Sequence, residues 1–341
     1  MEEFRYNFVF FFARYDFWRS VLGEELYNNK HVRIYKEAFS GSSLLEKIFH
    51  YHWAYSINRK ICLPFKRLWF KKMFSQDFED DLPIIFIYFA GGTIYYGKEF
   101  LQYVKRKNPN NKNVMLYADL LSKSGEKEHY LLKDLVDLEL TYDASEAKKY
   151  GIAYSPCVVY SKLIPEPENP NVKYDVYFLG AAKDRLYKIH DVYRYLKKNG
   201  LRCKFIVTGV PKEMQIEGIE YSNGISYEQN LQYVIQSKCL LEIIQGYSSD
   251  ITMRAREAIA YRRKFITNCP RKLTDLFHED QLCQFEDAKD ISLSFLKADF
   301  YPDNFNPKID LNPLSRLFFI QDKVDEKNEI KSDSFCDYSG L

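Results

Sequence analysis

Short apolar runs alternate with amphipathic stretches along most of this 341-residue chain. Such alternation is typical of parallel sheets covered by helices on both faces, because two neighbouring parallel strands need a crossover connection that is usually a helix. The runs predict buried strands at 6–13, 84–89, 114–117, 138–141, 174–180, 203–208, 239–244 and 264–267. The amphipathic stretches predict helices at 16–29, 97–107, 185–198, 227–237 and 250–262, and a further charged helix between 117 and 138.

One stretch interrupts the alternation. Residues 163–173 (LIPEPENPNVK) contain three prolines and no periodic pattern, which is the composition of an interdomain linker. The residues beyond 323 are polar and aperiodic, as in a mobile tail. We therefore expect an N-terminal domain (1–162), a linker (163–173), a C-terminal domain (174–323) and a polar tail (324–341).

Composition excludes several classes of protein. Phe, Tyr and Trp make up 17% of the residues, so the chain buries enough apolar surface to exclude disorder over its whole length. The net charge is only +2, whereas a general nucleic-acid coat would carry a larger basic excess. The fold class we expect is therefore a globular α/β protein of two domains.

The common catalytic motifs are missing. No GxGxxG follows the first strand of either half, and GxxxxGK[ST], GxSxG and HExxH do not occur. The seven cysteines are scattered without a CxxC pair, and His50 and His52 would lie on opposite sides of a helix. We expect no metal site and no tightly bound cofactor.

The N-terminus does not resemble an export signal. Its apolar run, 8–13, follows two glutamates and is too short for a signal peptide, and no 18-residue apolar stretch exists. We therefore expect a cytoplasmic protein that meets a membrane only from its surface.

The segment 246–268 (GYSSDITMRAREAIAYRRKFITN) is the strongest candidate for a binding site. A polar loop runs into a helix, with Ser249 or Asp250 as expected N-cap, so that unpaired N–H groups and the helix dipole would attract an anion. Arg254 could add a phosphate contact. The alternative is that Arg254 and Glu257, one turn apart, merely form an ion pair on a solvated helix face.

A second loop supports an anion site. The strand 174–180 ends at Gly180 and is followed by Ala-Ala, Lys183, Asp184 and Arg185, which would let the backbone approach a diphosphate while the cations neutralise it. Both loops leave the carboxyl ends of parallel strands, where open α/β sheets bind ligands. Together they predict a nucleotide site.

Three segments resemble a known family. Residues 252–268 (TMRAREAIAYRRKFITN) are similar to the TMR-x-x-E-A-x-x-x-x-K-x-I-T segment of bacterial GT-B-fold glycosyltransferases of surface polysaccharide and lipopolysaccharide biosynthesis. VMLYAD (114–119) resembles a strand of that family that ends in an acidic residue. LTYDASEAKKYGIAYSP (140–156) resembles its FD-x-x-D-A-x-K-Y-G segment. The resemblance runs from about residue 80 to residue 268.

The resemblance implies two Rossmann-like domains that face each other across a cleft, the N-terminal one holding the acceptor and the C-terminal one a nucleotide-sugar donor. It implies that Glu257 meets the donor ribose. The diphosphate would lie on the preceding loop, with Gly180, Lys183 and Arg185 nearby, and no metal would be needed. The residues implied for that loop are Gly246, Ser248, Ser249 and Thr252, with Arg254 close by.

The sequence also departs from the family. Retaining relatives often carry a second glutamate eight residues before the first, but position 249 is Ser, and Asp250 is one residue away. This leaves the stereochemistry open. The usual small residue before the last strand is replaced by Tyr261-Arg262-Arg263.

Catalysis would place the donor diphosphate on the helix and cation charges, and an inverting enzyme would also need a carboxylate base. Asp16 and Asp119 both follow predicted strands and are the two candidates. The function we expect is therefore transfer of a sugar from a nucleotide-sugar to a glycan or lipid-linked glycan. The alternative is a non-catalytic protein of the same architecture that binds glycan or acts as a scaffold.

The stretch 47–76 contains seven basic residues and no acidic one, interleaved with aromatic residues. This composition suits the headgroup layer of an anionic membrane, and it would also suit single-stranded nucleic acid or a helical layer packed on the sheet. An enzyme that extends a lipid-linked glycan would need such a membrane surface. We therefore expect peripheral binding at the inner face of the membrane, and no nucleic-acid partner.

Overall fold

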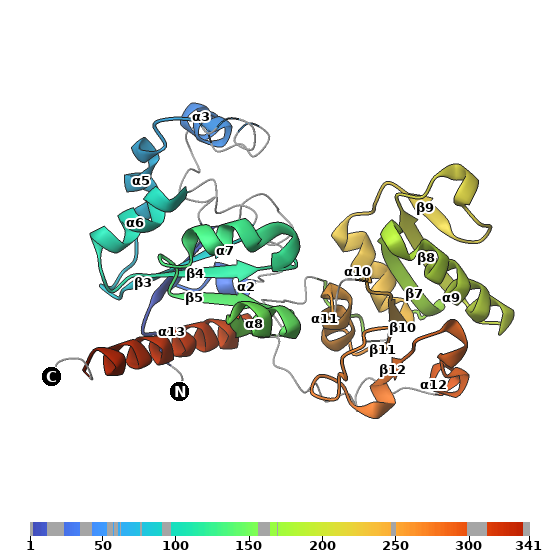
Figure 1. Ribbon diagram of the computed structural model, residues 1–341. Helices are drawn as coiled ribbons and strands as arrows, with labels where there is room; N and C mark the ends of the chain where they lie inside the picture. The colour runs from blue at the N-terminus through green and yellow to red at the C-terminus, as the bar shows by residue number, and fades with distance from the viewer. Residues whose placement is uncertain are drawn as a thin grey trace. The chain divides into compact units, whose positions relative to one another are not determined.

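The computed structural model (Figure 1) divides the chain into two compact units. Unit 1 comprises Met1–Val159 together with Asn312–Leu341, and unit 2 comprises Tyr160–Leu311. Each contains one six-stranded sheet in which all described strand pairs are parallel, so the predicted class of two Rossmann-like α/β domains is confirmed. The described residues are 3–11, 24–34, 43–52, 57, 61, 63–75, 77–90, 97–155, 164–168, 170–246, 250–298 and 312–336.

The sheet of unit 1 has the strand order β2-β1-β3-β4-β5-β6. Its strands are β1 (Asn7–Phe11), β2 (Val32–Ile34), β3 (Ile84–Phe89), β4 (Lys112–Tyr117), β5 (Leu138–Thr141) and β6 (Ala153–Tyr154). Its helices are α2 (Glu24–Tyr27), α3 (Ser43–His52), α5 (Arg67–Phe74), α6 (Gly97–Lys107), the π-helix η3 (Leu121–Gly125), α7 (Glu126–Leu132), α8 (Ala144–Tyr150) and α13 (Pro313–Cys336).

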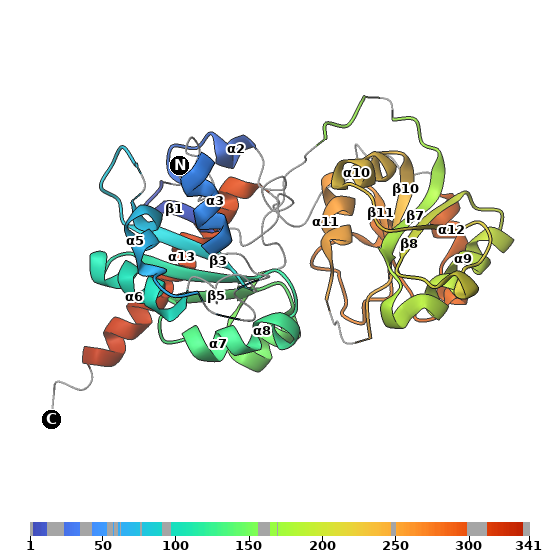
Figure 2. The same cartoon turned by 90° about the horizontal axis from the view of Figure 1, so that it is seen from above.

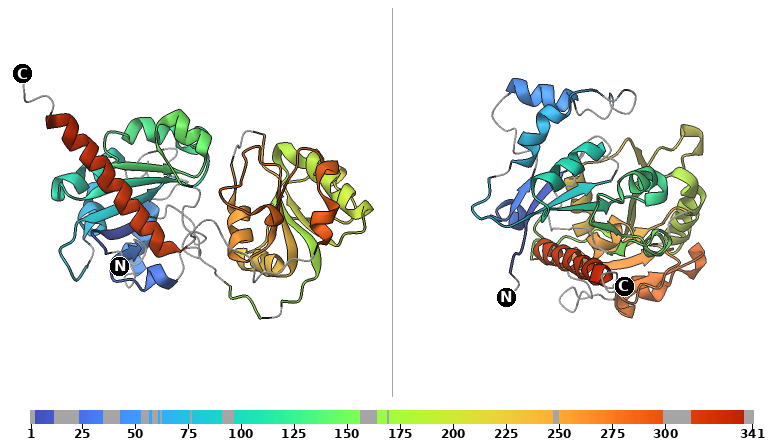
Figure 3. Two further views of the ribbon diagram at one scale, coloured as in Figure 1. Left: turned by 90° about the horizontal axis from the view of Figure 1, so that it is seen from below. Right: turned by 60° about the vertical axis from the view of Figure 1, so that its left-hand side comes forward.

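Both faces of this sheet are buried. Side chains alternate along a strand, so Phe8 and Phe10 of β1 lie in one core while Val9 and Phe11 lie in the other. The first core includes apolar residues of α13, and the second includes apolar residues of α5, α6 and α7. Figure 1 and the left panel of Figure 3 show α13 running along its own face of the sheet.

Helix α13 changes the predicted domain boundaries. Residues 312–323 belong to unit 1 and not to the C-terminal domain, and the expected polar tail is helical up to Cys336. The helix packs Leu317, Ile320 and Val324 against the sheet. Asp325 accepts hydrogen bonds from Arg5 Nε (2.8 Å) and Tyr6 Oη (2.7 Å), which fastens the helix to the N-terminal strand. The pKa of the Tyr6 hydroxyl is raised, mainly because the group is buried and also because it donates to the Asp325 carboxylate.

The sheet of unit 2 has the order β12-β11-β10-β7-β8-β9, which is the 3-2-1-4-5-6 order of dinucleotide-binding folds, read from β9. Its strands are β7 (Tyr174–Ala181), β8 (Cys203–Thr208), β9 (Glu220–Ser222), β10 (Ser237–Glu242), β11 (Lys264–Thr267) and β12 (Leu282–Gln284). Its helices are α9 (Leu186–Lys198), α10 (Tyr227–Ile235), α11 (Met253–Ala260), α12 (Leu293–Lys297) and the 3-10 turns η4 (Lys183–Arg185), η5 (Lys212–Met214), η6 (Glu279–Gln281) and η7 (Ala288–Asp290).

Helices cover both faces of this sheet too, with α10 and α11 on one side and α9 and α12 on the other (Figure 2). Val176 and Phe178 of β7 pack in a core with Ile189 of α9. Tyr177, between them, points to the opposite face, where its hydroxyl donates to Asn230 Oδ1 of α10 (3.0 Å). The apolar alternation of one strand thus places a polar group under α10.

The described part of the predicted linker is fastened to unit 2. Tyr261 Oη donates to the carbonyl of Ile164 (2.9 Å) and accepts its N–H (3.2 Å). Arg263 forms an ion pair with Glu166, and its guanidinium is almost fully buried. Tyr261 and Arg263, just before β11, therefore hold the linker.

Within the described part of the chain, no helix combines the length and the apolar character needed to cross a bilayer. Cys203, Cys239, Cys269 and Cys283 are free thiols, and burial raises the pKa of Cys239 and Cys269 to about 12.

We predict that Ile320→Ala destabilises unit 1 by about 2–5 kcal/mol, because the side chain is fully buried between α13 and the sheet and its loss leaves a cavity. Urea unfolding would measure the change in free energy. As a control on the same helix, Asp322→Ala removes an exposed ion pair with Arg5 and should change stability by less than about 1 kcal/mol. Equal effects of the two changes would contradict the packing of α13 described above.

Candidate functional site

The candidate site of unit 2 lies where the strand order reverses, between β7 and β10. These two strands are parallel neighbours, so their carboxyl ends and the loops that follow them lie side by side. The loops touch, because Gly246 N–H donates to Asp184 Oδ2 (3.1 Å). The structure therefore brings together the two loops that the sequence singled out.

In the first loop, the two predicted cations have different surroundings. Arg185 is engaged inside: its Nε donates to the carbonyl of Ala181 (3.1 Å) and its Nη1 to the carbonyl of Ile243, so it joins the ends of β7 and β10. A Cβ at Gly180 would lie 2.9 Å from Arg185 Nη2, so a larger residue there would displace the end of this guanidinium group. Lys183 is exposed and has a φ of 45°, a conformation that costs energy for a residue with a side chain.

The start of α11 differs from the prediction. Its N-cap is Thr252, whose Oγ1 accepts from Arg254 N (3.2 Å), and not Ser249 or Asp250. Thr252 N–H and Oγ1 both donate to Glu242 Oε1, at 2.8 and 2.6 Å, and Ile251 N–H donates to Asp250 Oδ1 (2.8 Å). The chain's own oxygens thus bind several N–H groups that were expected to be free for an anion.

Glu242, at the carboxyl end of β10, joins the start of α11 to the carboxyl end of β11, since its Oε2 also accepts from Thr267 Oγ1 of β11 (2.8 Å). Burial raises the pKa of this carboxyl group, and the two threonines oppose the increase. Sequence reasoning passed over Glu242 because it falls inside an apolar run.

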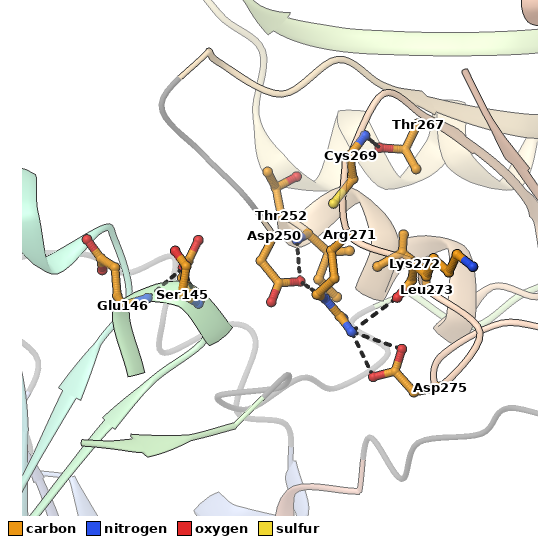
Figure 4. A network of polar contacts seen from close by, with 12 residues as sticks. Ser145, Glu146, Asp250, Thr252, Thr267, Cys269, Arg271, Lys272, Leu273 and Asp275 are labelled. Carbon is orange, nitrogen blue, oxygen red and sulfur yellow. Dashed lines mark hydrogen bonds and ion pairs between the residues drawn. The ribbon is translucent and has the colours of Figure 1, made fainter. Parts of the chain in front are cut away.

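Asp250 is also buried, and its partner is Arg271 (Figure 4). Arg271 Nε donates to Asp250 Oδ1 (3.0 Å) and Nη1 to Asp275 (2.9 Å). The pair ties the loop after β11 to the loop before α11. Asp250 therefore does not present a free carboxylate to a ligand.

Arg254 and Glu257 form an ion pair, but in the interior and not on a solvated face. Glu257 is only 2% exposed, and its Oε1 accepts from Asn230 Nδ2 (2.9 Å). Arg254 donates to Asn230 Oδ1 (3.1 Å) and to the carbonyl of Leu179 (3.3 Å), and its guanidinium lies 5.2 Å from the centre of the Tyr177 ring. Burial lowers the pKa of Arg254, but Glu257 and its neighbours outweigh this and raise it.

These four residues connect β7, α10 and α11 beneath the candidate site. Neither Tyr177 nor Asn230 was singled out from the sequence, because the partners are far apart in the chain. Ser248 and Ser249 lie outside the described residues. Among the described residues of these two loops, the exposed ones are Lys183, Asp184 and Gly246.

In unit 1, the candidate base Asp119 follows β4 and is exposed, with Oδ1 accepting from Leu120 N–H (2.9 Å). The next turn is held from α8: the buried Glu146 accepts from Leu121 N (2.6 Å), Ser122 N (2.9 Å) and Ser122 Oγ (2.6 Å). Glu146 thus positions the loop that carries Asp119. The other candidate base, Asp16, lies outside the described residues.

The segment 140–156 positions Glu146 by ordinary helix capping. Asp143 accepts from the N–H groups of Ser145 and Glu146 at the start of α8, and Gly151 ends the helix with a φ of 65°. In the same unit, the buried Glu139 has two side-chain partners. Its Oε1 accepts from Tyr117 Oη (2.7 Å) and lies 2.9 Å from His129 Nδ1. No group of three or more His, Cys, Asp or Glu side chains among the described residues is arranged to hold a metal ion.

No protein-family model and no curated protein matches the chain. Among solved structures, it is similar to a UDP-N-acetylglucosamine 2-epimerase from Rickettsia bellii, with 10% identity and a TM-score of 0.46 over 98% of this chain and 97% of that one. It is also similar to an α-glucosyltransferase in complex with UDP and a 13-mer DNA that contains an HMU base. The identity is 11% and the TM-score 0.37, over 54% of this chain and 60% of that one. A third similar structure is a putative UDP-N-acetylglucosamine 2-epimerase from Listeria monocytogenes, with 9% identity and a TM-score of 0.36 over 71% of this chain and 67% of that one. At these scores the similarities carry no argument about activity.

We predict that Arg254→Met lowers the free energy of unfolding by about 3–5 kcal/mol, because it leaves the buried Glu257 carboxylate without its cation. The double variant Arg254→Met/Glu257→Gln should recover part of this loss, since the unpaired charge is then gone as well. Chemical denaturation of the three variants measures both effects.

The matched control is Arg194→Met on α9. Arg194 pairs with Asp191 at the same spacing of three residues, but both side chains are more than half exposed. This change should alter stability by less than about 1 kcal/mol. An equally small effect at Arg254 would mean that its pair with Glu257 is solvated.

Proposed function

We propose that the protein is a glycosyltransferase that moves a sugar from a nucleotide-sugar to a glycan or lipid-linked glycan in the synthesis of cell-surface polysaccharide, including lipopolysaccharide. The observation that carries the proposal is the exposed Lys183 at the reversal of strand order in unit 2, held at positive φ beside Gly246. Open α/β sheets bind ligands at this place, and the chain there has an exposed cation and two glycines, Gly180 and Gly246. The choice of sugar transfer rests on the resemblance of residues 252–268 to the glycosyltransferase segment.

The donor diphosphate would contact the Lys183 ammonium group and the backbone near Gly246, Ser248 and Ser249. Asp184 now accepts the Gly246 N–H, so its carboxylate would have to turn away as the phosphate enters. Thr252 and Arg185 would shape the pocket from behind, because their polar groups are engaged with the chain. In this proposal, cations of the chain stabilise the leaving diphosphate and no metal is required.

Arg254 and Glu257 would not touch the donor unless its binding breaks the hydrogen bonds that they make within the protein. The resemblance implies phosphate and ribose contacts for them, yet both oxygens of Glu257 are engaged by Asn230 and Arg254. We propose that the pair holds β7 and α11 in register under the donor.

In the transfer step, Asp119 would accept the proton of the acceptor hydroxyl as its oxygen bonds to the anomeric carbon. The bond from that carbon to the diphosphate would break, and its electron pair would leave with the nucleotide. This assignment corresponds to an inverting reaction. Asp16 is the alternative base, and a retaining reaction would need neither of them in this role.

One observation favours the non-catalytic alternative, a glycan-binding or scaffold protein. Three carboxylates, Asp184, Glu242 and Asp250, already bind backbone N–H groups at the edge where the donor diphosphate would lie. Negative charge at this edge opposes a second anion. Hydrolysis or transfer of a nucleotide-sugar by the purified protein would exclude this alternative.

We predict that Lys183→Asn weakens the binding of the best nucleoside diphosphate about tenfold or more, the scale of one lost charged hydrogen bond. Asn tolerates the left-handed backbone, so the loop should keep its shape. Calorimetry against a panel of nucleoside diphosphates gives the affinities. Lys198→Asn, an exposed lysine at the other end of α9, is the control and should bind like the wild type. Binding of no nucleotide at millimolar concentration would contradict the donor site.

We predict that Asp119→Asn lowers the rate of transfer by a factor of about 10²–10⁴, the contribution typical of a general base. Nucleotide binding should not change, because Asp119 belongs to unit 1. A radiolabelled-sugar transfer assay with saturating donor measures the rate. Unchanged transfer would assign the base to another residue, and Asp16→Asn is then the next variant to test.

A further inference from the structure

Exposed apolar side chains are concentrated in one part of unit 1. Among the described residues, eleven large hydrophobic side chains are exposed, and seven of these lie between positions 44 and 68. They are Leu44 (69%), Leu45 (53%), Ile48 (46%), Tyr51 (65%), Ile61 (68%), Phe65 (74%) and Leu68 (77%). Single exposed apolar residues are ordinary, but a group of this kind marks an interaction surface.

Helix α3 has two apolar faces, and only one of them is used inside the protein. Phe49 is buried and packs edge-on against Trp69 at 5.3 Å between ring centres. Leu44, Ile48 and Tyr51 follow one another at helical spacing on another face and are exposed. The right panel of Figure 3 shows α3 standing away from the sheet of unit 1.

The exposed helix is nevertheless held firmly to α5. Trp69 Nε1 donates to His52 Nδ1 (2.8 Å), and His52 Nε2 lies 2.5 Å from the carbonyl of Pro64. Because Nδ1 accepts the indole proton, Nε2 carries the ring proton and donates to that carbonyl. These contacts join the end of α3 to the turn before α5, so the two helices present one surface. We call the seven exposed residues, together with Lys47, Lys71 and Lys72, the α3–α5 surface.

From position 47 onward, the charged residues interleaved with these apolar residues are all basic, whereas α3 carries one acidic residue, Glu46, just before that stretch. The stretch 47–76 has seven basic residues and no acidic one. Lys47 on α3 and Lys71 and Lys72 on α5 are exposed, and Arg67 pairs with Glu99 of α6. Apolar side chains surrounded by lysines suit a partner that has an apolar interior and an anionic boundary.

We infer that the α3–α5 surface docks onto an anionic lipid bilayer. Leu44, Ile48 and Leu68 would enter the boundary between headgroups and acyl chains, and the lysines would lie among the anionic headgroups. The other partner suggested by the sequence, single-stranded nucleic acid, fits less well. Five of the seven exposed side chains are aliphatic and have no ring on which a base can stack.

This inference deepens the proposed function by naming the surface that would bring the enzyme to a lipid-linked acceptor. It does not depend on the sugar chemistry, because every residue that carries it lies in α3, in α5 or between them. A failure to bind vesicles would therefore overturn this inference alone, and a failure to bind nucleotides would overturn the proposed function alone.

Vesicle flotation with the full chain tests the inference. Vesicles of about two parts phosphatidylcholine to one part phosphatidylglycerol should carry the protein upward, and vesicles of phosphatidylcholine alone should bind it at least about tenfold less well. Raising the salt concentration should weaken binding, since the charges lie in water. Equal binding to both kinds of vesicle, or binding to neither, would overturn the inference.

Two variants separate the two contributions. Lys47→Gln/Lys71→Gln should weaken binding to the anionic vesicles roughly 30-fold, at about 1 kcal/mol for each basic residue. Leu44→Ser/Ile48→Ser should weaken it at least about tenfold at any salt concentration, because two apolar side chains no longer leave water. Both pairs are exposed, so neither change should disturb folding.

The matched control is Tyr187→Ser on α9, since Tyr187 is as exposed as Phe65 but lies in unit 2. It should bind vesicles like the wild type. If Tyr187→Ser weakens binding as much as the variants of the α3–α5 surface, that surface is not the docking site. Two results without vesicle binding would assign the surface to another partner. A salt-sensitive gel shift with single-stranded DNA would indicate nucleic acid, and a dimer abolished by Leu44→Ser/Ile48→Ser would indicate a second copy of the chain.

Discussion

Each of the two sheets consists of parallel strands and must be covered on both faces, and this requirement determines most of the structure. Unit 1 meets it with α5, α6 and α7 on one face and with α13 on the other. The chain returns to unit 1 after completing unit 2, because without Leu317, Ile320 and Val324 a row of buried phenylalanines would face water. Helix α3 contributes Phe49 to the core under α5, α6 and α7, and another of its apolar faces is exposed.

The same requirement buries charged groups in unit 2. Helix α11 lies against β10 and β11, so its polar side chains on that side must find partners within the protein. Arg254 and Glu257 neutralise each other, and Asn230 and Tyr177 complete their hydrogen bonds. Glu242 is matched by two threonines instead of a cation, which is why burial can raise its pKa. A rigid polar layer of this kind gives the loops above it a defined position.

The carboxyl edge of unit 2 thus combines features that favour a ligand with features that oppose an anion. Glycines at 180 and 246 and the exposed Lys183 favour a phosphate group, whereas Asp184 occupies the Gly246 N–H. Whether a phosphate group binds here depends on whether the Asp184 carboxylate releases the Gly246 N–H. Tyr261 and Arg263 add a further constraint, because they fasten the residues before β7 to the far end of α11.

Local patterns in the sequence are enough to predict the α/β class and many of the elements. The predicted strands Ile84–Phe89, Leu138–Thr141, Cys203–Thr208 and Lys264–Thr267 and the helix Gly97–Lys107 agree with the structure, because strong local patterns specify them. The short edge strands β2, β6, β9 and β12 were missed, since a strand of two or three residues is too short to show an alternating pattern. The sequence also indicated that the loops after β7 and β10 share one edge, because parallel strands end on the same side.

The partners of Arg254, Glu257 and Thr252 become apparent only in the folded chain. Whether Arg254 and Glu257 face solvent depends on the elements packed over α11, and their partners are up to 75 residues away in the chain. The helix start at Thr252 follows from Glu242 on a neighbouring strand, and the place of α13 follows from the apolar face of a sheet formed some two hundred residues earlier. Local sequence specifies local hydrogen bonding and burial pattern, but it carries no direct signal of which distant group neutralises a buried charge.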